Sequence, residues 1–143
     1  MKCLLVLLSL AALTRAQEFP ACLCGAFITL MEEEIEVFRL PPIEVADCDA
    51  TTDCRARCID EWTTITEDGD LDYAWLDGVT IGQHMCDSLH DNDHSDVGPH
   101  EVYLYYNICL GPWIYTGQTS RNTLCCSSSN YLTCPPPPTV FQN

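Results

Sequence analysis

Residues 103–134 read YLYYNICLGPWIYTGQTSRNTLCCSSSNYLTC, and this stretch decides the fold because its cysteines need partners from the upstream chain. Its first part alternates, with Leu104 and Tyr106 on one face of a predicted strand and Tyr103 and Tyr105 on the other. The dipeptide Gly-Pro at 111–112 ends that strand, and 113–115 predicts another short one. The tyrosines and Trp113 could line a binding face, although alternate members are expected in the core.

The end of the stretch predicts a closing hairpin. Its two arms are residues 124–126 and 131–134, and the polar segment 127–130 is the expected turn. Neighbouring residues of a strand point to opposite faces. We therefore expect Cys125 and Cys126 to form disulfides in different directions. Cys134 is the last cysteine of the predicted domain.

The first 16 residues have the pattern of a secretory signal peptide. Lys2 precedes an apolar run, and Thr14 and Ala16 place small residues before a plausible cleavage site. The run is too short for a membrane-spanning helix, which needs about 20 apolar residues. We expect a secreted, extracellular protein without membrane insertion, with a domain at 17–134 and a proline-rich tail at 135–143.

The cysteine count and the net charge narrow the class of protein further. Without residues 1–16 the chain keeps ten of its 11 cysteines, and its four arginines stand against 21 acidic residues, a formal charge of −17. Ten cysteines in an exported chain predict five disulfides rather than a metal cluster. The ten are Cys22, Cys24, Cys48, Cys54, Cys58, Cys86, Cys109, Cys125, Cys126 and Cys134. Strong negative charge disfavours nucleic acid as a partner and permits a cationic one.

Upstream, the pattern predicts a small antiparallel sheet with one helix. Residues 26–31 and 35–40 alternate like the arms of a hairpin, with a turn at the acidic residues 32–34. Cys54, Cys58, Trp62 and Ile65 recur at helical spacing over 51–65. Cys54 and Cys58 cannot pair with each other on one helical face, and we expect each to reach a different strand. The predicted fold is α+β, with a disulfide-clamped helix.

Two polar segments are candidate metal sites. Asp68, Asp70 and Asp72 begin like an EF-hand loop, but Tyr73 and Val79 occupy the positions that need Gly and Glu, so only weak calcium binding by clustered carboxylates is expected. Residues 86–100 are rich in Asp and His and predict a long exposed loop. In this loop His90, Asp91, Asp93 and His94 are weak candidates for calcium, zinc or copper ligands. No other cofactor is expected.

Catalytic motifs are weak in this sequence. Residues 86–91, CDSLHD, look like the His-Asp motif of secreted phospholipases, but the second cysteine and a glycine-rich calcium loop are absent from the sequence. There is no Gly-x-Ser-x-Gly elbow of a serine hydrolase. We expect a protein that is not an enzyme.

The cysteine pattern resembles the small secreted, cysteine-rich follicle cell protein family of insects and other arthropods. The resemblance rests on Cys-Leu-Cys-Gly-Ala-Phe at 22–27, on Cys54 and Cys58, on residues 103–113, and on the Cys-Cys pair at 125–126 followed by Cys134. It implies secretion and a place in an extracellular coat such as an eggshell, without enzymatic activity. The expected function is thus a structural or interaction protein of such a layer, with an extracellular protein or matrix as partner. The alternative is a secreted salivary or venom effector that binds a cationic protein or calcium.

Overall fold

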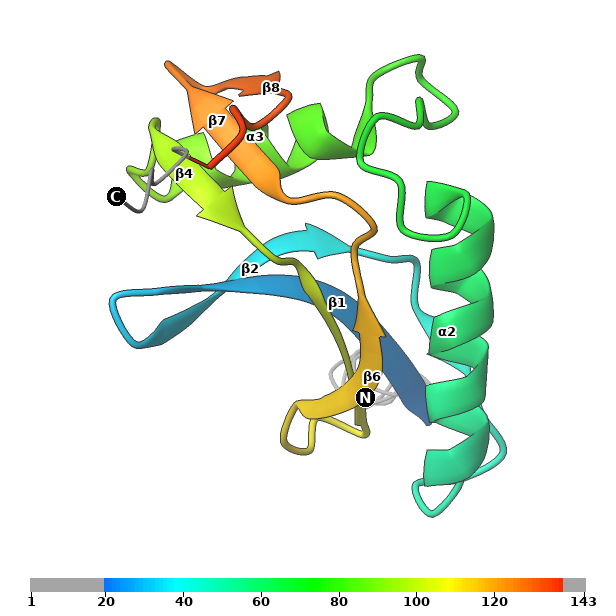
Figure 1. Ribbon diagram of the computed structural model, residues 1–143. Helices are drawn as coiled ribbons and strands as arrows, with labels where there is room; N and C mark the ends of the chain where they lie inside the picture. The colour runs from blue at the N-terminus through cyan, green and yellow to red at the C-terminus, as the bar shows by residue number, and fades with distance from the viewer. Residues whose placement is uncertain (1–19, 138–143) are drawn as a thin grey trace, which may run out of the picture.

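The computed structural model describes residues 20–137, which form eight strands and two helices (Figure 1). The signal peptide predicted for residues 1–16 lies outside this range. Only Pro135 to Pro137 of the predicted tail are described, and their side chains are exposed. The predicted α+β class is confirmed, because antiparallel sheets pack with helices and disulfides join the two.

The larger sheet has five antiparallel strands. Its main order is β2 (Glu33–Arg39), β1 (Ala21–Leu30), β5 (Tyr103–Ile108) and β6 (Ile114–Thr119), and the short β3 (Ile43–Glu44) also pairs with β1. The predicted hairpin is confirmed, with its turn at Met31 and Glu32, whose φ angles are 49° and 69°. A β-bulge between Ala26 and Phe27 shifts the register of β1 against β2. Such a bulge increases the local twist of the hairpin.

The predicted first helix is confirmed as α2 (Thr51–Thr66), which packs on β1, β5 and β6. Cys54 and Cys58 form disulfides with Cys22 and Cys24. Both bridges reach the same strand, β1, so the prediction that each cysteine reaches a different strand is wrong. The physical reason is a match of spacing: two residues along a strand advance about 6.6 Å, and four along a helix advance about 6 Å.

The prediction of a long exposed loop at Cys86 to His100 is also wrong. Helix α3 (Ile81–Asp91) covers the first part, and strand β4 (Val97–His100) ends it. The helix begins upstream of that segment, where the Thr80 side chain accepts a hydrogen bond from the Gln83 backbone N–H at 3.1 Å. The residues on the buried face of α3 are interspersed in sequence with the polar residues that suggested a loop. These buried residues are Ile81, Gly82, Met85, Cys86 and Leu89.

A second, smaller sheet completes the fold. Its order is β4, β7 (Leu124–Ser127) and β8 (Asn130–Leu132), and β7 and β8 form the predicted closing hairpin. Cys126 pairs with Cys86 of α3, while Cys125 pairs with Cys134, which confirms that the adjacent cysteines bridge in different directions. The fifth bridge, Cys48–Cys109, joins the loop before α2 to the end of β5. Figure 1 shows α3 and the small sheet at one end of the larger sheet, and α2 along its side.

One hydrophobic core runs through both parts. Its largest fully buried side chains come from both helices, from the large sheet and from the connections, and they include Trp62, Ile28, Leu40, Leu71, Ile81, Met85, Leu89, Leu104 and Leu124. Within residues 20–137, neither helix is both long and apolar enough to cross a bilayer.

Candidate functional site

The first group of predicted metal ligands lies in the turn after α2. Asp68 is exposed, with Oδ2 3.8 Å from Arg121 Nη2. Asp70 accepts a hydrogen bond from the Asp72 backbone N–H at 2.9 Å, and Asp72 accepts one from the Tyr131 hydroxyl at 2.8 Å. Each carboxylate therefore has a different partner.

The second group lies around the end of α3. His90 and Asp91 are in its last turn, and Asp93 follows with a φ of 65°. His94 is half-buried. Over residues 20–137, the only ligand atoms of three such residues within 4.8 Å of one another are those of Cys22, Cys54 and Cys58, all engaged in disulfides. The predicted acidic and histidine ligands are not brought together, and calcium binding stays a prediction.

His90 instead contacts two hydroxyl groups. Its Nδ1 lies 2.8 Å from Ser129 Oγ and 3.3 Å from Ser95 Oγ, so it joins the end of α3 to the β7–β8 turn. A serine nucleophile would need its histidine oriented by a further group. In the described part of the chain the hydrogen bonds of the His90 ring go to these two serines. This arrangement accounts for packing of the turn and gives no support to a catalytic role.

A cluster of rings on the larger sheet is the stronger candidate. Cys24 of β1 pairs with Tyr106 of β5, and both face α2, because Cys24 is bonded to that helix. The alternating positions face the other way, where Phe27 pairs with Tyr103 and Tyr105 pairs with Tyr115. We define the aromatic face as Phe27, Tyr103, Tyr105, Trp113 and Tyr115.

The rings of the aromatic face touch one another edge to face or at a tilt. Centroid distances are 5.2 Å for Phe27–Tyr105, 5.0 Å for Phe27–Trp113, 5.7 Å for Tyr103–Tyr115 and 5.5 Å for Tyr105–Tyr115. Such pairs stabilise by about 0.5–1.5 kcal/mol beyond the area they bury. The face is thus a preordered surface on which Tyr115 is 43% exposed. Tyr106 belongs to the same sequence motif but is buried on the opposite side of the sheet, which packs on α2.

Gly25 makes room for this cluster. A Cβ at this position would lie 3.0 Å from Phe27 Cε2 and 3.2 Å from Trp113 Cη2. The sequence suggested a binding face from Tyr103, Tyr105, Tyr106, Trp113 and Tyr115. Tyr106 is instead buried on the side of the sheet that packs on α2, and the sequence did not identify Phe27. The missing signal is the register between β1 and β5, which brings Phe27 beside Tyr103.

One end of the aromatic face already holds a cation. The Arg39 guanidinium lies 5.1 Å from the centroid of the Trp113 ring. It also donates two hydrogen bonds of 2.6 Å to the Glu36 carboxylate. The hydrogen bonds to Glu36 raise the pKa of Arg39. Arg39 therefore shows that a guanidinium fits between this aromatic surface and a carboxylate.

The other end combines tyrosines with carboxylates. The Tyr103 hydroxyl donates to Glu101 Oε2 at 2.9 Å, and this hydrogen bond raises the pKa of Tyr103. Burial first, and then the negative charge of Glu34, raise the pKa of Tyr105. In this region rings with negative faces lie beside exposed carboxylates, which is the chemistry that attracts a cation.

The arginines are engaged elsewhere. Arg55 donates to the Thr116 carbonyl at 2.7 Å, Arg57 to the Glu44 carbonyl at 2.6 Å, and Arg121 to the Glu67 carbonyl at 2.8 Å. Together with Arg39 they are the only arginines of residues 20–137, which contain no lysine. Within residues 20–137, no lysine or arginine is therefore left to serve the tyrosine end of the aromatic face.

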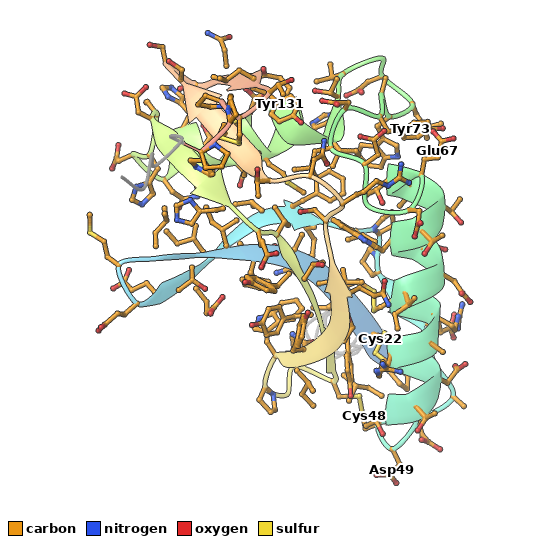
Figure 2. The ribbon with its side chains drawn as sticks, viewed as in Figure 1. Cys22, Cys48, Asp49, Glu67, Tyr73 and Tyr131 are labelled. Carbon is orange, nitrogen blue, oxygen red and sulfur yellow. A yellow bond between two sulfur atoms is a disulfide. The ribbon has the colours of Figure 1, made fainter. Side chains whose placement is uncertain are left out.

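A second surface feature lies beside the last turns of α2. A pocket there is lined by Thr64, Ile65, Tyr73, Ala74, Trp75 and Leu76. Figure 2 shows Tyr73 and Glu67 at this end of the helix. Asp77 Oδ2 lies 2.9 Å from His84 Nε2, and a backbone hydrogen bond from Val79, followed by the contact with His84, lowers the pKa of Asp77. Leu76 is 96% exposed, so this loop contributes an apolar tip but only a shallow, open pocket.

Comparisons with models of protein families, with curated proteins and with solved structures found no match for this chain.

Proposed function

We propose that this is a secreted, non-enzymatic interaction protein of an extracellular layer, and that its aromatic face binds a cationic segment of a partner protein. Five disulfides are typical of secreted proteins. The resemblance of the cysteine pattern to follicle cell proteins supports a coat such as an eggshell as the layer. The negative charge of the chain supports a basic partner.

The observation that carries the proposal is the contact of Arg39 with Trp113 and Glu36. It is an intramolecular example of a guanidinium bound between a ring and a carboxylate. The adjacent end of the same face repeats the composition with Tyr103, Tyr105 and Tyr115 beside Glu34 and Glu101. An arginine or lysine of a partner would supply the cation that the described part of this chain does not supply there.

A short arginine-rich peptide is a suitable probe for this face. We expect Tyr115→Ala to weaken its binding about 2- to 30-fold, because one cation–π contact contributes about 0.5–2 kcal/mol. The matched control is Tyr73→Ala, which removes a tyrosine of similar exposure from the pocket beside α2 instead of from the aromatic face. Dissociation constants from isothermal titration calorimetry at several salt concentrations would measure both.

A second pair of variants separates the face from general charge attraction. We expect the double variant Glu34→Gln with Glu101→Gln to lower the affinity for the peptide. The control, Asp60→Asn with Glu61→Gln, removes the same charge from the exposed side of α2 and should lower the affinity less. Equal effects of the two double variants, together with no effect of Tyr115→Ala, would contradict recognition by the aromatic face. The binding would then reflect only the net charge of the chain.

The layer itself needs a different test. In situ hybridisation in ovary, integument and secretory glands would locate the transcript, and extraction would show whether the protein is matrix-bound. Expression in follicle or epithelial cells with an insoluble product supports the coat. A soluble product confined to a salivary or venom gland would instead favour an effector, which could use the same face on a basic host protein.

A further inference from the structure

The Cys48–Cys109 disulfide differs from the other four in its exposure. Cys48 is exposed and Cys109 is half-buried. Seven of the other eight bridged cysteines are at most 4% exposed, and the eighth, Cys134, is bonded to Cys125, which is 3% exposed. Thiol–disulfide exchange requires that a thiolate reach a sulfur atom. By access alone, Cys48 is the best target among the bridged cysteines of residues 20–137.

The charges beside Cys48 are of one sign. It lies between Asp47 and Asp49, both exposed, in the loop that leads into α2. Asp47 Oδ1 accepts a hydrogen bond of 2.9 Å from the Asp49 backbone N–H, which keeps its carboxylate on this loop. Figure 2 shows Cys48 and Asp49 at the periphery, below the start of α2. Both arginines of α2 are engaged elsewhere: Arg55 donates to the Thr116 carbonyl, and Arg57 contacts Asp53 and the Glu44 carbonyl.

Opening this bridge leaves the surrounding elements anchored. Helix α2 stays bonded to β1 through Cys22–Cys54 and Cys24–Cys58. On the other side, the Cys109 backbone N–H donates to the Ala21 carbonyl at 2.9 Å, which holds the end of β5 to β1. The loop before α2 keeps the hydrogen bond from the Val45 N–H to the Pro20 carbonyl. A local opening can therefore occur without unfolding of the domain.

We propose that Cys48–Cys109 is the exchangeable disulfide of this protein, and that it reacts preferentially with cationic thiols. The thiolate of the incoming molecule attacks Cys48 Sγ, a new disulfide forms to Cys48, and the Cys48–Cys109 bond breaks. Cys109 leaves as a thiolate and takes a proton from water. No external oxidant or reductant is needed, because the incoming thiol is oxidised as Cys109 is reduced. A cysteine of a protein segment rich in basic residues would be the corresponding biological reactant.

The selectivity follows from Coulomb interactions at the point of attack. Two carboxylates beside the sulfur attract a reagent that carries an ammonium group and repel one that carries a carboxylate. At low ionic strength we expect the cationic thiol cysteamine to react about 10-fold faster than anionic mercaptopropionate, at equal thiolate concentration. The difference should shrink to about twofold in about 1 M salt, where the Debye length is about 3 Å.

The oxidised full-length secreted protein would be treated briefly with each thiol, alkylated with N-ethylmaleimide and cleaved at its acidic residues. Mass spectrometry should find Cys109 alkylated and Cys48 in a mixed disulfide before any other cysteine reacts. Earlier labelling of Cys125 and Cys134, or simultaneous opening of several bridges, would overturn the assignment of the exchangeable disulfide.

The net charge of the chain also attracts cationic thiols, so the local effect needs its own control. Asp47→Asn with Asp49→Asn should reduce the preference for cysteamine about threefold or more. Asp91→Asn with Asp93→Asn removes the same charge from the last turn of α3 and the residues just after it, and should leave the preference within about twofold of the unaltered chain. An equal loss of preference in both variants would refute selectivity by the two aspartates.

Discussion

At the scale of single residues, Tyr131 joins β8 to α3 and to the turn after α2. Its hydroxyl donates to Asp72 Oδ1 at 2.8 Å, and its ring lies so close to Gly82 that a Cβ there would be 2.5 Å from the ring. Figure 2 shows Tyr131 above α3. Burial first, and then the hydrogen bond to Asp72, raise the pKa of Tyr131 well above its ordinary value of 10.0. The folded state therefore favours the protonated phenol.

This raised pKa predicts loss of stability in alkali. Above pH 10 the unfolded chain releases the Tyr131 proton while the folded chain retains it, so the free energy of unfolding falls as pH rises. The loss from this group is at most about 1.4 kcal/mol per pH unit. Tyr131→Phe should be less stable at pH 7, by about 1 kcal/mol for the lost hydrogen bond. Its stability should nevertheless decline less steeply above pH 10.

Urea unfolding between pH 7 and pH 11 would measure both slopes. Tyr73→Phe is the control, because Tyr73 is exposed on the loop beside α2. If the unaltered chain and Tyr131→Phe lose stability in parallel above pH 10, Tyr131 is not the group responsible.

At the scale of elements, the two bridges between β1 and α2 act as one clamp. Alone, each closes a loop of more than 30 residues, since the sequence separations are 32 and 34. With one bridge in place, the other closes a ring of only about 6 residues, two along β1 and four along α2. The entropic effect of a disulfide grows with the loop it closes. The second bridge therefore constrains the unfolded chain much less than the first.

The costs of removing the two bridges should consequently be non-additive. Cys22→Ala with Cys54→Ala should lower the free energy of unfolding by about 2 kcal/mol, plus the cost of the cavity left by the buried sulfurs. Cys24→Ala with Cys58→Ala should behave similarly. Removing both bridges should cost about 1.5 kcal/mol more than the sum of the separate losses. Urea unfolding of the three variants tests this, and strictly additive losses would contradict a shared clamp.

The elements also show what the sequence could and could not predict. Helix α2 was predictable because its cysteines and Trp62 repeat at helical spacing and all three are buried. Helix α3 was not, because its buried residues begin at Ile81 while the His and Asp residues that follow dominate the segment. The pairing of Cys22 with Cys54 depends on how α2 lies along β1, which is a tertiary property. The aromatic face required the strand register in the same way, since Phe27 is remote in sequence from Tyr103.

At the scale of the whole molecule, negative charge is the dominant property. The formal charge is −15 over the full sequence, and each of the four arginines in residues 20–137 contacts a carbonyl or a carboxylate. Self-repulsion of like charges destabilises a compact state. The aromatic face and the Cys48 loop both lie in this negative field. Their predicted preference for cations thus has a local cause and a global one.

Screening of this repulsion should stabilise the fold. We expect the unfolding temperature to rise by a few degrees between about 0.01 M and 0.3 M sodium chloride, because the Debye length falls from about 30 Å to about 6 Å. Differential scanning calorimetry would measure the shift, with an uncharged osmolyte at equal osmolality as the control. The ion pairs of the arginines oppose the rise because salt weakens them; they are Arg39–Glu36 at 2.6 Å, Arg121–Asp68 at 3.8 Å and Arg57–Asp53 at 3.9 Å. A lower unfolding temperature in salt would show that such local pairs outweigh the repulsion among the acidic residues.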